Sequence, residues 1–144
     1  MTRTTLTYTI WLGVTLLFTS CHNNERKIDT YENLKKDLKA VELEKKAPTA
    51  DPDGFESEVN NGGLNQYFFN ASGQNCFETL RYFKQTGKKE EAKILEEAID
   101  LINPKKLSEK ELLEKLRKRS VDELDDSVIN KKLDELDNQF YALK

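Results

Sequence analysis

Apolar residues along this chain recur mostly at intervals of three and four, the spacing that places them on one face of a helix. No stretch shows the strict alternation expected of a half-buried strand. The pattern therefore predicts an all-α protein, folded as a single compact multi-helix domain of five or six helices. The predicted helices cover residues 30–46, 64–69, 75–87, 88–102, 108–119 and 120–143, with a short helical entry at residues 55–59. In residues 30–46 the apolar face consists of Tyr31, Leu34, Leu38, Val41 and Leu43.

Residues typical of helix ends separate these segments. Gly87 is a C-terminal stop, and the short connection that it makes predicts that the helices on either side of it pack antiparallel. Ser108 followed by Glu111 is a capping-box pattern, and residues 120–123 repeat it, so we expect one long final helix that starts at this second pattern. Residues 47–54 contain two prolines and a glycine and are expected to form a loop or linker.

The least regular stretch is residues 58–73, EVNNGGLNQYFFNASG. Its paired glycines permit backbone angles that a Cβ forbids, and its asparagines can cap a helix, so we expect a turn that feeds a helix from Leu64. Glu58 lies close in sequence to several amides, which favours either a ligand-binding cluster or a set of hydrogen bonds that satisfies the turn. We prefer the structural interpretation, and a core position for Tyr67 and its neighbours. The candidate site residues are Glu58, Asn60, Asn61, Gly62, Gly63, Gln66, Tyr67 and Asn70.

This stretch, with a helix pair that ends near Asn103 and Pro104, resembles the core of the DNA-mimic protein family over residues 55–104. The resemblance implies a small all-helical domain. A characterised member is an acidic, dimeric mimic of DNA that occupies a transcription factor. The resemblance thus implies a protein partner and leaves a homodimer as an open alternative.

The N-terminus has the features of an export signal. Arg3 precedes an uncharged, apolar stretch that is too short for a comfortable membrane span. The stretch ends in Leu-Phe-Thr-Ser-Cys, which resembles a bacterial lipobox, so we expect a lipoprotein signal peptide at residues 1–20 and lipidation at Cys21. An uncleaved anchor and an ordinary secretory signal are the alternatives.

Residues 21–29 are polar and are expected to tether the helical domain, residues 30–144, to a membrane. Residue 22 is not the Asp that retains some lipoproteins in the inner membrane, which favours a cell-envelope location at the outer membrane. Cys76 has no neighbouring histidine and is expected to be buried in a helix.

The charges of the chain nearly cancel, with 26 acidic and 23 basic side chains. Nucleic-acid binding requires a basic excess, so we expect no direct contact with nucleic acid. Residues 115–119 hold four cations at the end of a predicted helix, where they favour the helix dipole. The final helix is expected to carry acids on its outer face, and these normally serve solubility. They are Asp122, Glu123, Asp125, Asp126, Asp134, Glu135 and Asp137.

The sequence contains no recognisable nucleophile–base pair, phosphate loop or metal-ligand spacing, so we expect no enzymatic activity, no metal and no cofactor. The favoured function is an envelope-anchored lipoprotein whose helical domain binds an unidentified protein partner. An acidic DNA mimic and a toxin-immunity-like inhibitor are alternatives within the binding class. A small-molecule or enzymatic site at the Asn-Gly motif is the alternative from another class.

Overall fold

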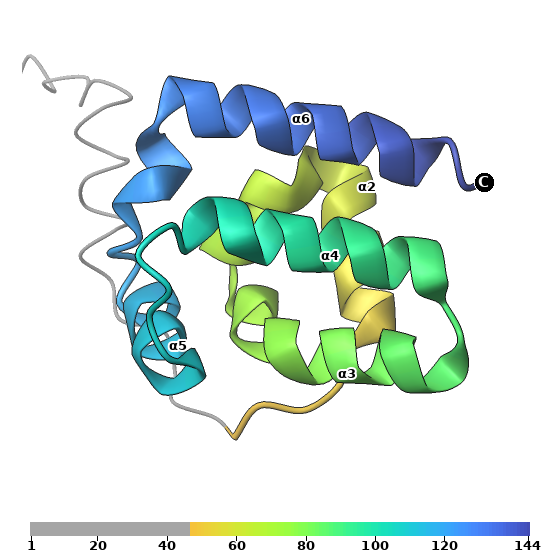
Figure 1. Cartoon of the computed structure of the whole chain (residues 1–144), viewed down its shortest axis with the longest axis horizontal. Coiled ribbons are helices and arrows are strands. Elements are labelled where there is room, and N and C mark those ends of the chain that lie inside the picture. Colours follow the sequence, from red (N-terminus) through yellow and green to blue (C-terminus); the bar gives the residue numbers. More distant parts are fainter. Residues whose placement is uncertain (1–46) are drawn as a thin grey trace, which may run out of the picture.

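The computed structural model describes residues 47–144, and the secondary structure in this range is entirely helical (Figure 1). The predicted all-α fold is confirmed. The predicted helix at residues 30–46, the signal peptide and Cys21 lie outside the described residues. The elements are α2 (Pro52–Phe69), the 3-10 turn η1 (Ala71–Asn75), α3 (Cys76–Thr86), α4 (Lys89–Ile102), α5 (Glu109–Arg117), the 3-10 turn η2 (Asp122–Asp125) and α6 (Ser127–Tyr141).

Helix α2 begins earlier than the sequence pattern predicted. Asp51 accepts a hydrogen bond from the backbone N–H of Gly54 at 2.9 Å and is the N-cap, and Pro52 occupies the first helical position. Proline suits this position because its missing N–H would have no partner in the first turn. Part of the predicted loop at residues 47–54 is therefore helical.

Helices α3 and α4 form the predicted antiparallel hairpin (Figure 1). Gly87 ends α3 in the left-handed conformation, with φ of 76°, and its N–H returns to the carbonyl of Phe83. Asn103 follows α4 and is buried, and its side chain exchanges hydrogen bonds with the backbone N–H and carbonyl of Leu107. These local bonds direct the chain from α4 into α5.

The final helix starts later than predicted. The capping pattern at residues 120–123 does not start a helix, because Ser120 donates its hydroxyl to the carbonyl of Lys115 and η2 follows as a separate turn. Asp126 is the N-cap of α6 and accepts from the N–H groups of Val128 and Ile129. Val128, in the first turn of α6, is 62% exposed although its spacing from the apolar residues of the final helix predicts burial.

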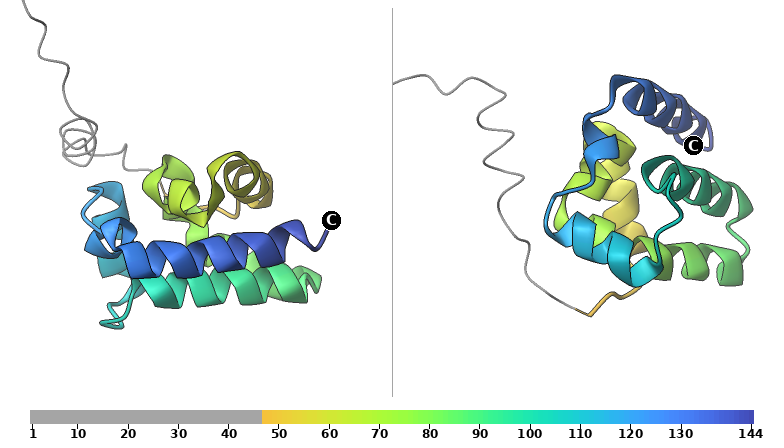
Figure 2. Two further views of the ribbon diagram at one scale, coloured as in Figure 1. Left: turned by 90° about the horizontal axis from the view of Figure 1, so that it is seen from above. Right: turned by 60° about the vertical axis from the view of Figure 1, so that its left-hand side comes forward.

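Helix α6 lies alongside α4 and over α2, and α5 crosses one end of the molecule (Figures 1 and 2). Phe55 of α2 is fully buried at the centre of the core. Its ring makes edge-to-face contacts with Tyr67, Phe83 and Phe140 at centroid distances of 5.0, 5.4 and 5.5 Å. Such contacts add to the stabilisation from apolar burial, so α2, α3 and α6 are held around one aromatic cluster.

Candidate functional site

The Asn-Gly motif forms a break inside α2 rather than a free turn. Gly62 has φ of −161°, which any residue can adopt, whereas Gly63 has φ of 78° and ψ of −178°. The latter combination is restricted almost entirely to glycine. The break leaves backbone groups on both sides without the partners that a continuous helix would give them.

Helix α6 supplies partners for two of these groups. Asp137 Oδ1 accepts from the backbone N–H of Leu64 at 2.8 Å, which caps the second half of α2. The Tyr141 hydroxyl donates to the carbonyl of Val59 at 2.7 Å, in the last turn before the break. Asp137 was expected on the outer acidic face of the final helix and is instead 8% exposed. The predicted capping by Asn60 or Asn61 is wrong, because the cap of the second half of α2 comes from α6.

The pKa of Asp137 is raised to about 6, mainly by burial and to a smaller extent by the nearby charge of Asp134, while the hydrogen bond from Leu64 lowers it. The carboxylate is thus held in a poorly solvated position by its capping role.

Glu58 lies on another side of α2, at the centre of a polar cluster. Its carboxylate accepts from Gln66 Nε2 at 2.7 Å, from Asn70 Nδ2 at 2.8 Å and from the Ser72 hydroxyl at 3.4 Å. The predicted residues Glu58, Gln66 and Asn70 are therefore brought together, with Ser72 as a member that the sequence analysis missed. The cluster joins the two halves of α2 to η1 through side-chain donors, and not through backbone groups that the turn leaves unpaired.

The other candidate residues lie apart from this cluster. Asn60 and Asn61 are exposed, and Asn60 Oδ1 accepts from Lys144 Nζ at 2.9 Å. Tyr67 is fully buried, and its hydroxyl has no hydrogen-bond partner among the described residues. Burial raises the pKa of Tyr67 well above its ordinary value, with a smaller contribution from Cys76. The aromatic part of the motif therefore belongs to the core.

Asn65 was not a candidate, yet it makes the motif's contact with η2. Its side-chain amide donates to the carbonyl of Leu124 at 2.9 Å and to Asn130 Oδ1. The motif is thus bonded to η2 through Asn65 and to α6 through Asn65, Leu64 and Val59.

A shallow groove of about 380 Å³ runs between α4 and α6. Its apolar lining comes from Leu101 and Leu136, and its acids are Glu97, Asp100 and Glu135. One cation, Lys132, also lines it. We call this surface the α4–α6 groove. Asp100 pairs with Lys106 at 2.7 Å and Glu97 approaches Lys93 at 4.0 Å, so nearby lysines balance much of the negative charge. Leu136 is buried, and Leu101 is the partly exposed apolar residue of the groove.

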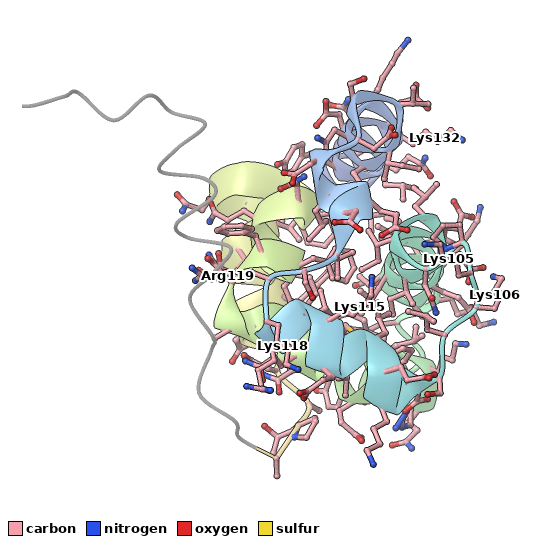
Figure 3. All side chains as sticks on the ribbon, turned by 90° about the vertical axis from the view of Figure 1, so that its left-hand side faces the viewer. Lys105, Lys106, Lys115, Lys118, Arg119 and Lys132 are labelled. Carbon is pink, nitrogen blue, oxygen red and sulfur yellow. The ribbon has the colours of Figure 1, made fainter. Side chains whose placement is uncertain are left out.

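The cations of residues 115–119 do not form a separate basic surface. Arg117 is buried and pairs with Glu114 at 2.6 Å, Lys118 reaches the same carboxylate, and Lys115 donates to the carbonyl of Ser120. Arg119 lies over the Phe69 ring at 4.7 Å. Figure 3 shows that Lys105, Lys106 and Lys132 come from other segments and are spread across the same end of the molecule. The prediction that these cations serve the helix end and its acidic neighbours agrees with this arrangement.

Within residues 47–144 no group of three or more His, Cys, Asp and Glu side chains is placed to hold a metal ion. In the same range no helix combines the length and the apolar character needed to cross a membrane. Cys76 is buried as predicted, and this burial raises the pKa of its thiol to about 12. The thiol is therefore protonated and unreactive at neutral pH.

Comparison with known families gives a match. A family model described as DMP19-like protein matches residues 53–144, which extend from the first turn of α2 to the C-terminus and exceed the predicted range of 55–104. No curated protein and no solved structure shows significant similarity to the chain.

Proposed function

This chain belongs to the DMP19-like family, named for DNA mimic protein 19, and from that premise we propose that it is a non-catalytic protein-binding module tethered to the cell envelope. The tether would be a lipid on Cys21, and the binding surface would be the α4–α6 groove. The single observation that carries the proposal is this groove, in which acids surround leucine side chains.

The arrangement of the Asn-Gly motif supports a surface rather than a pocket as the functional feature. Glu58 is engaged by three side chains of its own cluster, and Leu64 and Val59 are bonded to α6. Groups that already satisfy one another would have to give up these bonds before they could hold a ligand. The motif therefore supports the helical scaffold that presents the groove.

The chemistry of the groove defines its partner. Glu135 favours a basic surface, and the exposed ion pairs of Glu97 and Asp100 with Lys93 and Lys106 are weak enough for a partner's cations to replace the lysines. Leu101 favours an apolar side chain at the centre of the groove. A partner that presents an aromatic or aliphatic residue flanked by lysine or arginine would match both features. Because part of the contact is apolar, added salt is expected to weaken binding only moderately.

The test compares two double charge reversals in the full chain. Glu97→Lys with Glu135→Lys changes the groove, and Asp53→Lys with Glu90→Lys makes the same change of net charge at exposed positions outside it. After the partner has been recovered from envelope extract by cross-linking, the groove variant should bind it at least about tenfold more weakly, since charge reversal opposes association. The control variant should bind like the wild type. Equal binding by both variants would exclude the groove.

The same measurement distinguishes the alternatives. Binding that disappears steeply with salt would favour an acidic DNA mimic, whose affinity depends on charge. Loss of binding in Glu58→Ala with unchanged thermal stability would favour a ligand site at the motif. We expect Glu58→Ala to lower the melting temperature instead, because it removes the acceptor of three hydrogen bonds.

The anchor has its own experiment. Cys21→Ser removes the only sulfur to which lipid could be attached at the predicted lipobox. Stable anchoring requires more than one acyl chain, and the variant has no sulfur at this position to receive any lipid. The variant should therefore move from the membrane fraction to the soluble fraction. If the variant still sediments with membranes and is processed at the same place, the lipoprotein assignment is wrong.

A further inference from the structure

A second groove, of about 700 Å³, lies beside α5, and we call it the α5 groove. Pro48 forms one wall, Gln74 and Glu78 another, and Leu113 and Arg117 of α5 complete it. Its surface is more apolar than polar, because Leu113, Pro48 and the aliphatic stems of charged residues contribute to it. Leu113 is only partly buried, which leaves apolar surface to be covered.

The sequence offers an occupant at this position. Residues 30–46 carry the pattern of an amphipathic helix, and they end two positions before Pro48, which is itself part of the groove. A helix of this length would be about 25 Å long and would be marginal in isolation, so it needs a surface against which to bury its apolar face. Attachment next to the groove gives the segment an effective concentration of about millimolar without any further contact.

The charges of the two partners nearly balance. At the rim of the α5 groove, Glu78 and Glu109 pair with Arg81, and Glu114 pairs with Arg117 and Lys118. The segment contains five lysines and four acids, and Lys45 and Lys46 lie closest to Pro48. Lysines beside the apolar face can reach acids at the edge of a groove while their stems cover apolar surface.

We propose that residues 30–46 dock as an amphipathic helix into the α5 groove of the same chain. The docked segment covers Leu113 and fixes the direction in which the chain leaves the domain. It also keeps the α5 groove from binding other proteins, so that the α4–α6 groove is the surface left open to a partner. The docking does not depend on lipidation of Cys21 or on the identity of the partner.

Cysteine cross-linking in the full chain tests the proposal. Leu113→Cys is combined with Leu34→Cys or with Leu38→Cys, which lie on the apolar face of the segment, and the purified full chain is treated with a short bis-maleimide. The matched controls combine Leu113→Cys with Asn33→Cys or Ala40→Cys, on the opposite face, and a further control carries Leu113→Cys alone. Cys21 is replaced by Ser in every variant. Cys76 does not interfere, because it is buried and its thiol is protonated.

The expected result is an internally cross-linked monomer of altered gel mobility, at least about fivefold more abundant for the apolar-face pairs than for the controls. Two different apolar-face positions guard against local disruption by either substitution. Equal cross-linking of both faces would overturn the proposal, as would a product of dimer size, which would place the segment on a second copy. Cross-linking that is abolished by adding anionic vesicles, with the controls unchanged, would place the segment on lipid and would also overturn it.

Discussion

The N-terminus of α5 and the second half of α2 are both capped by an oxygen of a side chain, but the two oxygens come from very different places in the sequence. At α5, the Ser108 hydroxyl accepts from the N–H of Glu111, and the Glu111 carboxylate accepts from the N–H of Ser108, three positions away. At α2, the N–H of Leu64 is capped by Asp137, 73 positions away. The first cap is exposed and local, whereas the second is buried and joins two helices.

The difference shows which helix ends depend on tertiary structure. A capping box can form as soon as its own segment becomes helical. The break in α2 has no such local solution, since Asn60 and Asn61 are exposed and α6 supplies the bonds to Leu64 and Val59. Substitutions at the break should therefore affect the whole domain, and substitutions at the capping box should affect one helix.

The largest effect is expected from Gly63→Ala. A Cβ at Gly63 would lie 2.2 Å from Asp137 Oδ2, and the backbone there has φ of 78°. Strain and loss of the cap together should lower the free energy of unfolding by about 3 kcal/mol, as measured by urea denaturation.

Gly62→Ala is the matched control, since Gly62 has an extended φ of −161° and its Cβ would meet the mobile end of the Gln66 side chain. Gly62→Ala should lower the free energy of unfolding by about 1 kcal/mol, because the displaced Gln66 side chain weakens its hydrogen bond to Glu58. Equal losses for the two alanines would contradict the backbone argument.

Removal of the remote cap should have the next largest effect. Asp137→Ala leaves the N–H of Leu64 buried without an acceptor and should cost about 2 kcal/mol. Asp137→Asn retains an acceptor oxygen and should cost less. Hydrogen exchange should become faster in both α2 and α6 for the alanine variant, and a change confined to α6 would show that the cap is not needed by α2.

The pH dependence of stability tests the buried carboxylate. Its folded pKa of about 6 exceeds its unfolded value of about 3.9, so the folded state binds the proton more tightly. The resulting contribution of Asp137 to the free energy of unfolding is fully present below about pH 4 and is lost as the pH rises through 6. From pH 7 to pH 5, the wild type should gain about 1 kcal/mol relative to Asp137→Asn in urea unfolding. Parallel pH profiles for the two proteins would show that Asp137 titrates normally.

The smallest effect is expected at the local cap. Ser108→Ala removes the acceptor for the N–H of Glu111 and should lower the free energy of unfolding by about 1 kcal/mol. Faster hydrogen exchange should be limited to α5, with α2 and α6 unchanged. A global loss as large as that of Asp137→Ala would remove the distinction between the two caps.

These two caps also show how much could be predicted from the sequence. The α3–α4 hairpin, Gly87 and the Ser108 capping box were predicted correctly, because each depends on residues a few positions apart. The predicted start of α6 was wrong. Asp126 and the pattern at residues 120–123 are equally good N-cap candidates, and spacing alone does not decide between them.

Asp137 was misassigned although the sequence contained a sign of its burial. It lies four positions after Leu133 and three before Phe140, both of which are buried on the inner face of α6. A charged residue within an apolar stripe indicates a specific hydrogen-bond partner. The spacing of the stripe does not predict that this partner is the N–H of Leu64. The Glu58 cluster was foreseen more fully, since the amides Gln66 and Asn70 lie close to Glu58 in sequence.

The remote cap also determines when the domain can finish folding. The bonds from Leu64 to Asp137 and from Val59 to Tyr141 close loops of 73 and 82 residues, so they form late compared with contacts inside the α3–α4 hairpin. During synthesis the first half of the domain leaves the ribosome before α6 exists. A chain released before Tyr141 would lack both bonds at the break and should be recognised by proteases as unfolded.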